Sequence, residues 1–119
     1  MKGIVISTDD MIEVKDFAVP LHKTLGEAVG GTIEIVRPRG LGRPYVMIVN
    51  DEGLLLDLPL NRLGSLLYRT FEHGSPIVGN VVIMKEGMTS NGPDILGLDA
   101  IEVGSLMLSL NPEFKIAHS

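Results

Sequence analysis

Three arginines in the segment RPRGLGRP, residues 37–44, are the side chains best suited to binding an anion. Arg37, Arg39 and Arg43 give this segment a charge of +3, whereas the whole chain has a formal net charge of −5. A guanidinium group can bind a phosphate through two parallel hydrogen bonds, and glycines let the backbone approach a ligand closely. The segment therefore predicts a binding loop for a phosphorylated small molecule. The alternative is a solvated connector whose arginines pair with the surplus of carboxylates.

A second anion site is indicated where NDEGLLLDLPLNR, residues 50–62, enters a predicted helix. Asn61 and Arg62 fall in the first turn after Pro59, where free backbone N–H groups and the helix dipole favour an anion. Arg62 could then reach a phosphate, and Asn61 could form hydrogen bonds with a polar edge of the ligand. Alternatively, Asn61 fixes the junction by hydrogen-bonding to the backbone. Residues 50–53 are best explained as a turn.

Gly79 and Asn80 stand at the start of a predicted strand in GSPIVGNVVIM, residues 74–84. A ligand packed against the backbone would need such residues, and Asn80 would then read a polar edge of that ligand. A bulge, or a close contact between the strand and a helix, needs the same residue types. Asn80 is therefore a candidate ligand-binding residue with a structural alternative.

No recognisable catalytic group is present in the sequence. The chain contains no cysteine, which excludes thiolate catalysis and Cys-ligated metal sites. Its histidines, His22, His73 and His118, are scattered and lack a partner at metal-binding spacing. There is also no G-x-S-x-G motif for a serine nucleophile. We therefore expect a non-enzymatic protein with no metal and no cofactor.

The acidic net charge and the composition argue against two classes of binding partner, extended nucleic acid and membranes. A net charge of −5 and a pI of about 5.0 argue against coating extended nucleic acid, because neutralising phosphates needs a basic face. The first residues, MKGIVIST, are too short an apolar run for a signal peptide. No apolar run is long enough to span a bilayer. We expect a cytoplasmic protein with no membrane partner.

Hydrophobic patterns predict the elements that must position these side chains. Apolar residues that alternate or run together favour strands at 3–7, 11–17, 32–38, 45–50 and 77–85. LLLDL, residues 54–58, is expected to pair with 45–50 as a hairpin, and residues 86–94 are expected to form a polar loop.

Helical spacing of apolar residues favours helices over 19–31, 60–71 and 96–108, and residues 111–119 form a tail. Leu60, Leu63, Leu67 and Phe71 form the apolar stripe of the second helix. Asp99 is expected to cap the third helix, with Ile101, Leu106 and Leu108 mostly facing inward.

Together these elements predict an α+β fold for the whole chain. Its 119 residues, of which 45% are hydrophobic, fit a single globular domain over residues 1–119. We expect an antiparallel or mixed sheet of about four or five strands, with about two or three helices on one face.

The segments VNDEGLLLDLPLNR (49–62) and HGSPIVGNVVIM (73–84) carry a resemblance to a known family. They resemble small domains of unknown function that are common in phages, plasmids and conjugative elements. The resemblance covers about residues 32–85, which form the family-like core, and it implies an origin in a mobile element without supplying an activity. The matching residues are Asn50, Glu52, Gly53, Leu58, Pro59, Asn61, Arg62, Gly79 and Asn80.

A phage origin and two arginine-bearing segments favour one function above others. We expect a homo-oligomeric protein in the host cytoplasm that counters host defence by sequestering a phosphorylated or nucleotide-like molecule. Its ligand-binding residues would be Arg37, Arg39, Arg43, Asn61, Arg62 and Asn80. The alternative is a protein–protein inhibitor that covers a host defence enzyme with its acidic surface.

Overall fold

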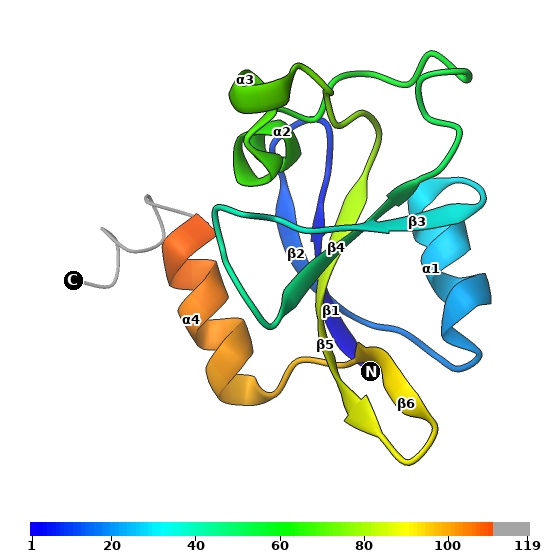
Figure 1. Ribbon diagram of the computed structural model, residues 1–119, viewed down its shortest axis with the longest axis vertical. Helices are drawn as coiled ribbons and strands as arrows, with labels where there is room; N and C mark the ends of the chain where they lie inside the picture. Colours follow the sequence, from blue (N-terminus) through cyan, green and yellow to red (C-terminus); the bar gives the residue numbers. More distant parts are fainter. Residues whose placement is uncertain (111–119) are drawn as a thin grey trace.

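The computed structural model describes residues 1–110 and shows an antiparallel six-stranded sheet with helices on both faces (Figure 1). The strands lie in the order β2-β1-β5-β4-β3, and β6 pairs with the second half of β5. The strands are β1 (Lys2–Ile6), β2 (Ile12–Asp16), β3 (Ile33–Val36), β4 (Tyr45–Asn50), β5 (Val81–Thr89) and β6 (Gly92–Leu96). The helices are α1 (Leu21–Val29), α2 (Arg62–Tyr68), α3 (Thr70–His73) and α4 (Ala100–Leu110).

The predicted α+β class is confirmed, and every strand pair is antiparallel. Within residues 1–110 the sheet has six strands and is accompanied by four helices, slightly more of each than predicted. The residues expected to form a tail, 111–119, lie outside the described part of the chain.

β4 and β5 lie inside the sheet, and their continuous apolar sequences follow from burial on both faces. Successive side chains of a strand point to opposite faces. Met47 is opposite Ile83, and both belong to the cluster beneath α4. Ile48 is opposite Val82, and both belong to the cluster beneath α1. The two central strands therefore hold together two hydrophobic layers.

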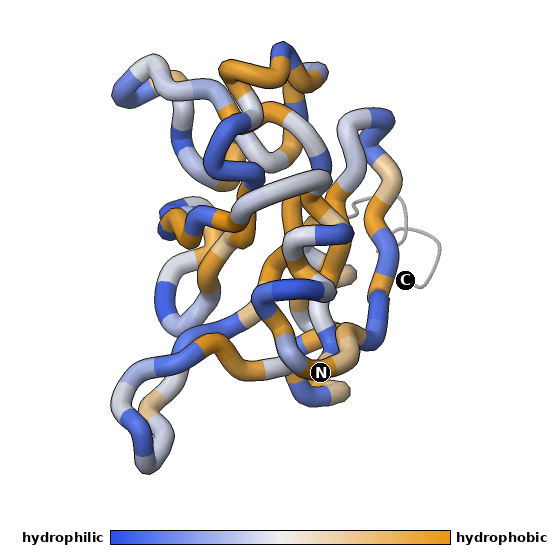
Figure 2. The backbone as a smooth tube through the Cα atoms, turned by 90° about the vertical axis from the view of Figure 1, so that its right-hand side faces the viewer, coloured by the Kyte–Doolittle hydropathy of each residue, from blue (hydrophilic) through white to orange (hydrophobic). Residues whose placement is uncertain are grey.

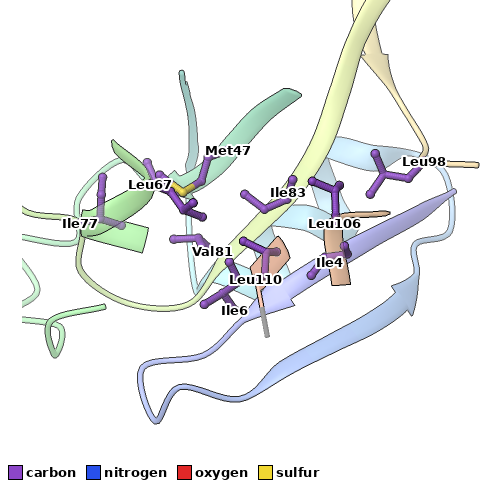
Figure 3. Close-up of a cluster of buried hydrophobic side chains, with 11 residues drawn as sticks. Ile4, Ile6, Met47, Leu67, Ile77, Val81, Ile83, Leu98, Leu106 and Leu110 are labelled. Carbon is purple, nitrogen blue, oxygen red and sulfur yellow. The ribbon is translucent and has the colours of Figure 1, made fainter. Parts of the chain in front are cut away.

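The larger cluster joins the sheet to α2 and α4 (Figure 3). Side chains of β1, β4 and β5 meet Leu67 of α2 and Leu106 and Leu110 of α4, as Figure 3 shows. Its buried members are Ile4, Ile6, Met47, Val49, Leu67, Ile77, Val81, Ile83, Leu98, Leu106 and Leu110.

The smaller cluster packs α1 against the opposite face of the sheet. Leu25 and Val29 are the buried residues of α1, and Phe17 joins them above the strands. The helix lies within the predicted range 19–31 and ends at Gly30, which has φ +87° and donates its N–H to the Gly26 carbonyl. The prediction that the helices lie on one face is wrong, because apolar side chains on both faces of the central strands require cover.

The start of α4 is confirmed as a capping box. The Asp99 carboxylate accepts the Glu102 N–H at 2.8 Å, and the Glu102 carboxylate accepts the Asp99 N–H at 2.9 Å. Leu106 faces the core as predicted. Ile101 and Leu108 do not, since they are 83% and 39% exposed. The helix presents only a narrow stripe to the sheet, so apolar residues outside this stripe remain in solvent.

The predicted hairpin of residues 45–58 is wrong. Both edges of β4 are already paired, one with β3 and the other with β5. Residues 54–58 therefore have no edge of β4 to join, and residues 51–57 form consecutive turns instead. Leu54, Leu55 and Leu56 are all exposed as a result.

Residues 86–94 were predicted as a polar loop, and this is also wrong. β5 continues to Thr89, turns through Ser90 and Asn91, and returns as β6. Gly92 has φ +96°, a conformation that favours glycine at a hairpin turn. An Asn-Gly pair between strands is a strong hairpin signal that outweighs the polar composition of the segment.

The single helix predicted over residues 60–71 is divided in two. Arg69 adopts a left-handed conformation with φ +58°, which ends α2 and starts the short helix α3. Leu60 precedes the cap of α2, and Phe71 follows the turn at Arg69, so the predicted apolar stripe does not stay on one side. Leu67 is buried, whereas Leu60 and Phe71 are 52% and 74% exposed.

Gly79 makes the close backbone contact that its position before β5 suggested. It has φ +76°, and it donates its N–H to the Pro59 carbonyl at 2.7 Å. A Cβ atom at this position would lie 2.8 Å from Cδ1 of Leu58. Glycine is thus required here both for backbone conformation and for space.

Replacing Gly79 with alanine should lower the free energy of unfolding by about 2–4 kcal/mol, through backbone strain and overpacking against Leu58. Urea titration of the purified variant measures this loss. Gly42→Ala is the matched control, because Gly42 also has φ +76° but has nothing within 4 Å of its Cβ position. The control should lose only about 1–2 kcal/mol, from backbone strain. Equal losses in the two variants would show that Leu58 simply moves aside.

Candidate functional site

The arginine loop, residues 37–44 between β3 and β4, has a fixed conformation. Pro38 is fully buried, and its carbonyl accepts the Leu41 N–H at 2.8 Å. The Gly40 N–H donates to the Leu67 carbonyl at 2.9 Å, which attaches the loop to α2. These contacts hold the backbone in place while the three arginine side chains extend into solvent.

The arginine loop brings its three arginines together around one hollow of about 280 Å³. This hollow is open to solvent and is lined by Arg37, Pro38, Arg39, Gly42, Arg43 and Tyr45. Tyr45 was predicted only as a strand residue. Its position directly after the loop was the signal that could have identified it as part of the same site.

Two of the three arginines also contact carboxylates. Arg37 Nη2 donates to both carboxylate oxygens of Glu86, at 3.0 and 3.2 Å. Arg39 lies 3.6 Å from the Glu72 carboxylate. Arg43 forms no ion pair with any residue in 1–110. Arg37 and Arg39 thus pair with carboxylates, as the alternative interpretation expected. The guanidinium of Arg43 has no carboxylate partner among residues 1–110.

Acidic residues beside Tyr45 influence its hydroxyl group. Burial raises the pKa of Tyr45 above its usual value, and the negative charges of Glu102 and Asp99 raise that pKa further. Glu102 also accepts a hydrogen bond from Lys85 at 2.7 Å, which raises the pKa of Lys85. The Tyr45 phenol therefore stays neutral at physiological pH and can donate a hydrogen bond to an anion in the hollow.

Arg62 does not join the other three arginines. It lines a separate groove beside α2 and α3, where its Nη2 lies 2.9 Å from the Asp10 carboxylate. The α2–α3 groove has a volume of about 880 Å³ and mostly apolar walls. It is lined by Asp10, Ile12, Leu60, Arg62, Leu63, Ser65, Leu66, Thr70, Phe71 and Leu110. The four predicted arginines thus divide between two surfaces.

Asn61 is the most completely buried of the predicted ligand residues, with 0% of its surface exposed. Its Oδ1 accepts the Gly64 N–H at 2.8 Å and caps α2. Its Nδ2 donates to the carbonyls of Ile6 and Gly79, each at 2.9 Å. The amide is used entirely within the chain, as the junction alternative proposed, and it does not face either hollow.

Asn80 also makes a contact within the chain. Its Oδ1 accepts the Thr8 N–H at 3.2 Å, and its side chain is half-buried. Asn80 lines neither the hollow of the arginine loop nor the α2–α3 groove. The contact joins the turn between β1 and β2 to the start of β5.

The turn predicted at residues 50–53 is present and is organised by Asn50. The Asn50 side chain is buried, accepts the Glu52 N–H at 2.8 Å and donates to the Val29 carbonyl at 3.1 Å. Asp51 and Glu52 are exposed. Asn50 thereby connects β4, the turn and the end of α1, a structural role that its place in the turn motif only partly suggested.

His22 and His73 lie on different helices and do not line the hollow of the arginine loop. His22 lies on α1, His73 ends α3 with its Nε2 3.1 Å from the Tyr68 carbonyl, and His118 lies outside the described residues. Among residues 1–110, no three His, Asp or Glu side chains gather where they could hold a metal ion. No helix in the same range has the length and apolar character needed to cross a membrane.

Comparison with known protein families identifies a match over most of the chain. The family model described as a domain of unknown function, DUF3846, matches residues 1–102. The match extends on both sides of the 32–85 core that the sequence motifs cover. A search of curated proteins found no match, and a search of solved structures found none either.

Replacing Asn61 with alanine should lower the free energy of unfolding by about 3–7 kcal/mol. The change removes the cap of α2, worth about 1 kcal/mol, and leaves two buried carbonyls without a donor, at about 1–3 kcal/mol each. Urea titration provides the measurement. Asn80→Ala is the control and should cost less than about 1 kcal/mol, because it removes a single half-buried hydrogen bond. A loss for Asn61→Ala as small as that of the control would contradict the structural role.

Proposed function

The chain belongs to the DUF3846 family, and we propose that it is a non-enzymatic protein that binds a small phosphorylated or nucleotide-like molecule in the hollow of the arginine loop. One observation carries the proposal: three arginines line a single hollow, on a loop whose backbone is held by hydrogen bonds within the loop and to α2. A fixed loop binds with a smaller loss of conformational entropy than a flexible one.

The charged side chains that line the hollow support an anionic ligand, because all of them are arginines: Arg37, Arg39 and Arg43. Around this lining, Glu86 and Glu72 pair with two of the arginines, and Glu102 and Asp99 lie near Tyr45, where Glu102 is paired with Lys85. The ion pairs of Glu86 and Glu72 are largely exposed, and exposed pairs stabilise proteins by only about 0–1 kcal/mol. A phosphate can therefore replace the carboxylates at small cost and gain the bidentate contacts that guanidinium groups favour.

The size of the hollow limits what it can hold. At about 280 Å³ it lies just below the range of roughly 300–1,000 Å³ in which proteins enclose complete small molecules. We infer that it holds the phosphate end of the ligand, with the Tyr45 phenol as an additional hydrogen-bond donor. The remainder of a nucleotide-like ligand lies outside the hollow.

The biological role that we propose is sequestration. The resemblance of residues 32–85 to domains of phages and plasmids supports a protein that acts in the cytoplasm of a host cell. There, binding without turnover would lower the concentration of a nucleotide-derived defence signal. The proposal requires affinity for the ligand and no chemical step.

Replacing Arg43 with alanine should lower the affinity for a phosphorylated ligand about tenfold to hundredfold. A hydrogen bond to a charged group contributes roughly 1.5–3 kcal/mol, and each factor of ten corresponds to about 1.4 kcal/mol. Isothermal titration with inorganic phosphate, ADP-ribose and a set of cyclic dinucleotides tests this, together with native mass spectrometry of protein purified from infected cells. Arg43 is the informative position because no residue in 1–110 pairs with it.

Arg62→Ala is the matched control, because Arg62 is an exposed arginine that lines the other groove. It should change the affinity less than about twofold, since an exposed ion pair is all that is lost. An equal loss of affinity in the two variants would show that the hollow of the arginine loop is not the binding site. No binding by the unchanged protein, combined with recovery of one host enzyme regardless of nucleotide, would instead favour the protein–protein inhibitor.

A further inference from the structure

β2 is an edge strand whose outer side has no partner strand among residues 1–110. It pairs with β1 alone, and its residues from Glu13 to Asp16 are all exposed. In Figure 2, β2 forms the right-hand margin of the molecule, and its colour alternates between hydrophobic and hydrophilic residues. An edge strand presents unpaired N–H and C=O groups and can therefore pair with a strand of another chain. The free edge of β2 is thus a candidate interaction surface.

Hydrogen bonds at the two ends of the β1–β2 hairpin show which backbone groups of β2 are free. The Phe17 N–H donates to the Met1 carbonyl at 2.7 Å, and the Ser7 N–H donates to the Met11 carbonyl at 2.9 Å. Met11 and Phe17 thus direct these groups toward β1, and the alternation of an antiparallel ladder gives every odd-numbered residue between them the same direction. The residues whose N–H and C=O groups point to the free edge are therefore Ile12, Val14 and Asp16.

The strand β2 is complementary to itself about Val14. When a second β2 runs antiparallel to it with Val14 on a two-fold axis, the even-numbered residues of the two strands are opposite one another and can exchange N–H···O=C bonds. Glu13 then lies opposite Lys15 of the second copy, and Lys15 lies opposite Glu13 of the second copy. These are the non-hydrogen-bonded positions, at which side chains of two strands approach most closely. Each of these charges therefore meets an opposite charge.

The charges of Glu13 and Lys15 are available for contacts with a second copy. Neither side chain forms an ion pair with another residue of 1–110. The other charged side chains of β1 and β2 are Lys2 and Asp16, which are opposite each other in the ladder. The Asp16 carboxylate also accepts a hydrogen bond from the N-terminal amine at 2.8 Å. The free edge thus offers one charge of each sign, on the two sides of Val14.

Two further carboxylates lie in the turn between β1 and β2. Asp10 forms an ion pair with Arg62 at 2.9 Å, and Asp9 accepts the Met11 N–H at 3.3 Å. Both precede the first residue of β2, Ile12, and they therefore place no charge opposite Glu13 or Lys15 in the two-fold arrangement.

These charges favour a second copy of the chain in a single register. Moving the two-fold axis to Glu13 or to Lys15 would place like charges opposite each other, which destabilises a strand pair. A lysine on an edge strand ordinarily opposes pairing with other strands, but a second β2 supplies a glutamate opposite each lysine. We propose that two copies of the chain pair through the free edges of β2 and form one continuous antiparallel sheet across a two-fold axis.

Charge reversal at positions 13 and 15 tests this pairing. The unchanged protein should be a dimer in sedimentation equilibrium experiments, which also measure its dissociation constant. Glu13→Lys and Lys15→Glu each replace the opposite-charge pairs of the dimer with like-charge pairs, so each should raise that constant about tenfold to hundredfold. Both residues are exposed, and urea titration checks that the variants remain folded.

The double variant, Glu13→Lys with Lys15→Glu, gives the sharpest comparison. It restores opposite charges across the axis and keeps the composition of the unchanged protein, so it should dimerise like that protein. An equimolar mixture of the two single variants should form heterodimers for the same reason. Glu34→Lys is the matched control and should leave the dissociation constant unchanged. Glu34 is an exposed glutamate on β3, at the other edge of the sheet, and has no ion pair within residues 1–110.

Amide hydrogen exchange adds a readout of the backbone pairing. In the dimer, the N–H groups of Ile12, Val14 and Asp16 should exchange slowly. In the monomeric Glu13→Lys variant they should exchange fast, whereas the N–H groups at positions 13 and 15 should stay protected by β1. An unchanged protein that is monomeric would overturn the proposal. So would a single reversal that dimerises as well as the unchanged protein, or a double variant that stays monomeric.

Discussion

The buried amide of Asn61 is the interaction on which the rest of the structure depends. Its three hydrogen bonds connect the first turn of α2, the end of β1 and the segment that leads into β5. No other side chain of the described residues is at once polar and fully buried. Because a buried amide stabilises a fold only when its donors and acceptors are all paired, the three segments must meet in one arrangement.

Two hollows of the surface depend on α2, which Asn61 caps. The carbonyl of Leu67, in the last turn of this helix, accepts the Gly40 N–H and so fixes the arginine loop. The opposite end of the helix carries Arg62 and Leu63, which line the groove. A helix of only seven residues has little stability of its own, so its cap and its buried Leu67 determine where both surfaces lie. The hollow of the arginine loop and the α2–α3 groove are thus two consequences of one packing arrangement.

The candidate site could be predicted in part from the sequence. Arg37, Arg39 and Arg43 are close in the chain, and a short loop rich in glycine and proline keeps them close in space. Arg62 is separated from them by a strand, a turn and a helix entry, so its direction depends on how α2 packs. Asn61 was ambiguous for a similar reason, because an amide at a helix start can bind a ligand or the backbone, and only its burial distinguishes the two.

The sequence by itself determined the local elements of this protein. Periodic apolar residues and caps such as Asp99 and Gly30 act within a few residues, so most strands and helices and the α+β class were recognisable. The tertiary structure decided which edges pair and which faces are covered. β4 already pairs with β3 and β5, so LLLDL has no edge to join and forms an exposed turn. Both faces of β4 and β5 are apolar, so helices cover both faces of the sheet. Pairing and cover are properties of the whole chain, because each strand edge and each apolar face can be used only once.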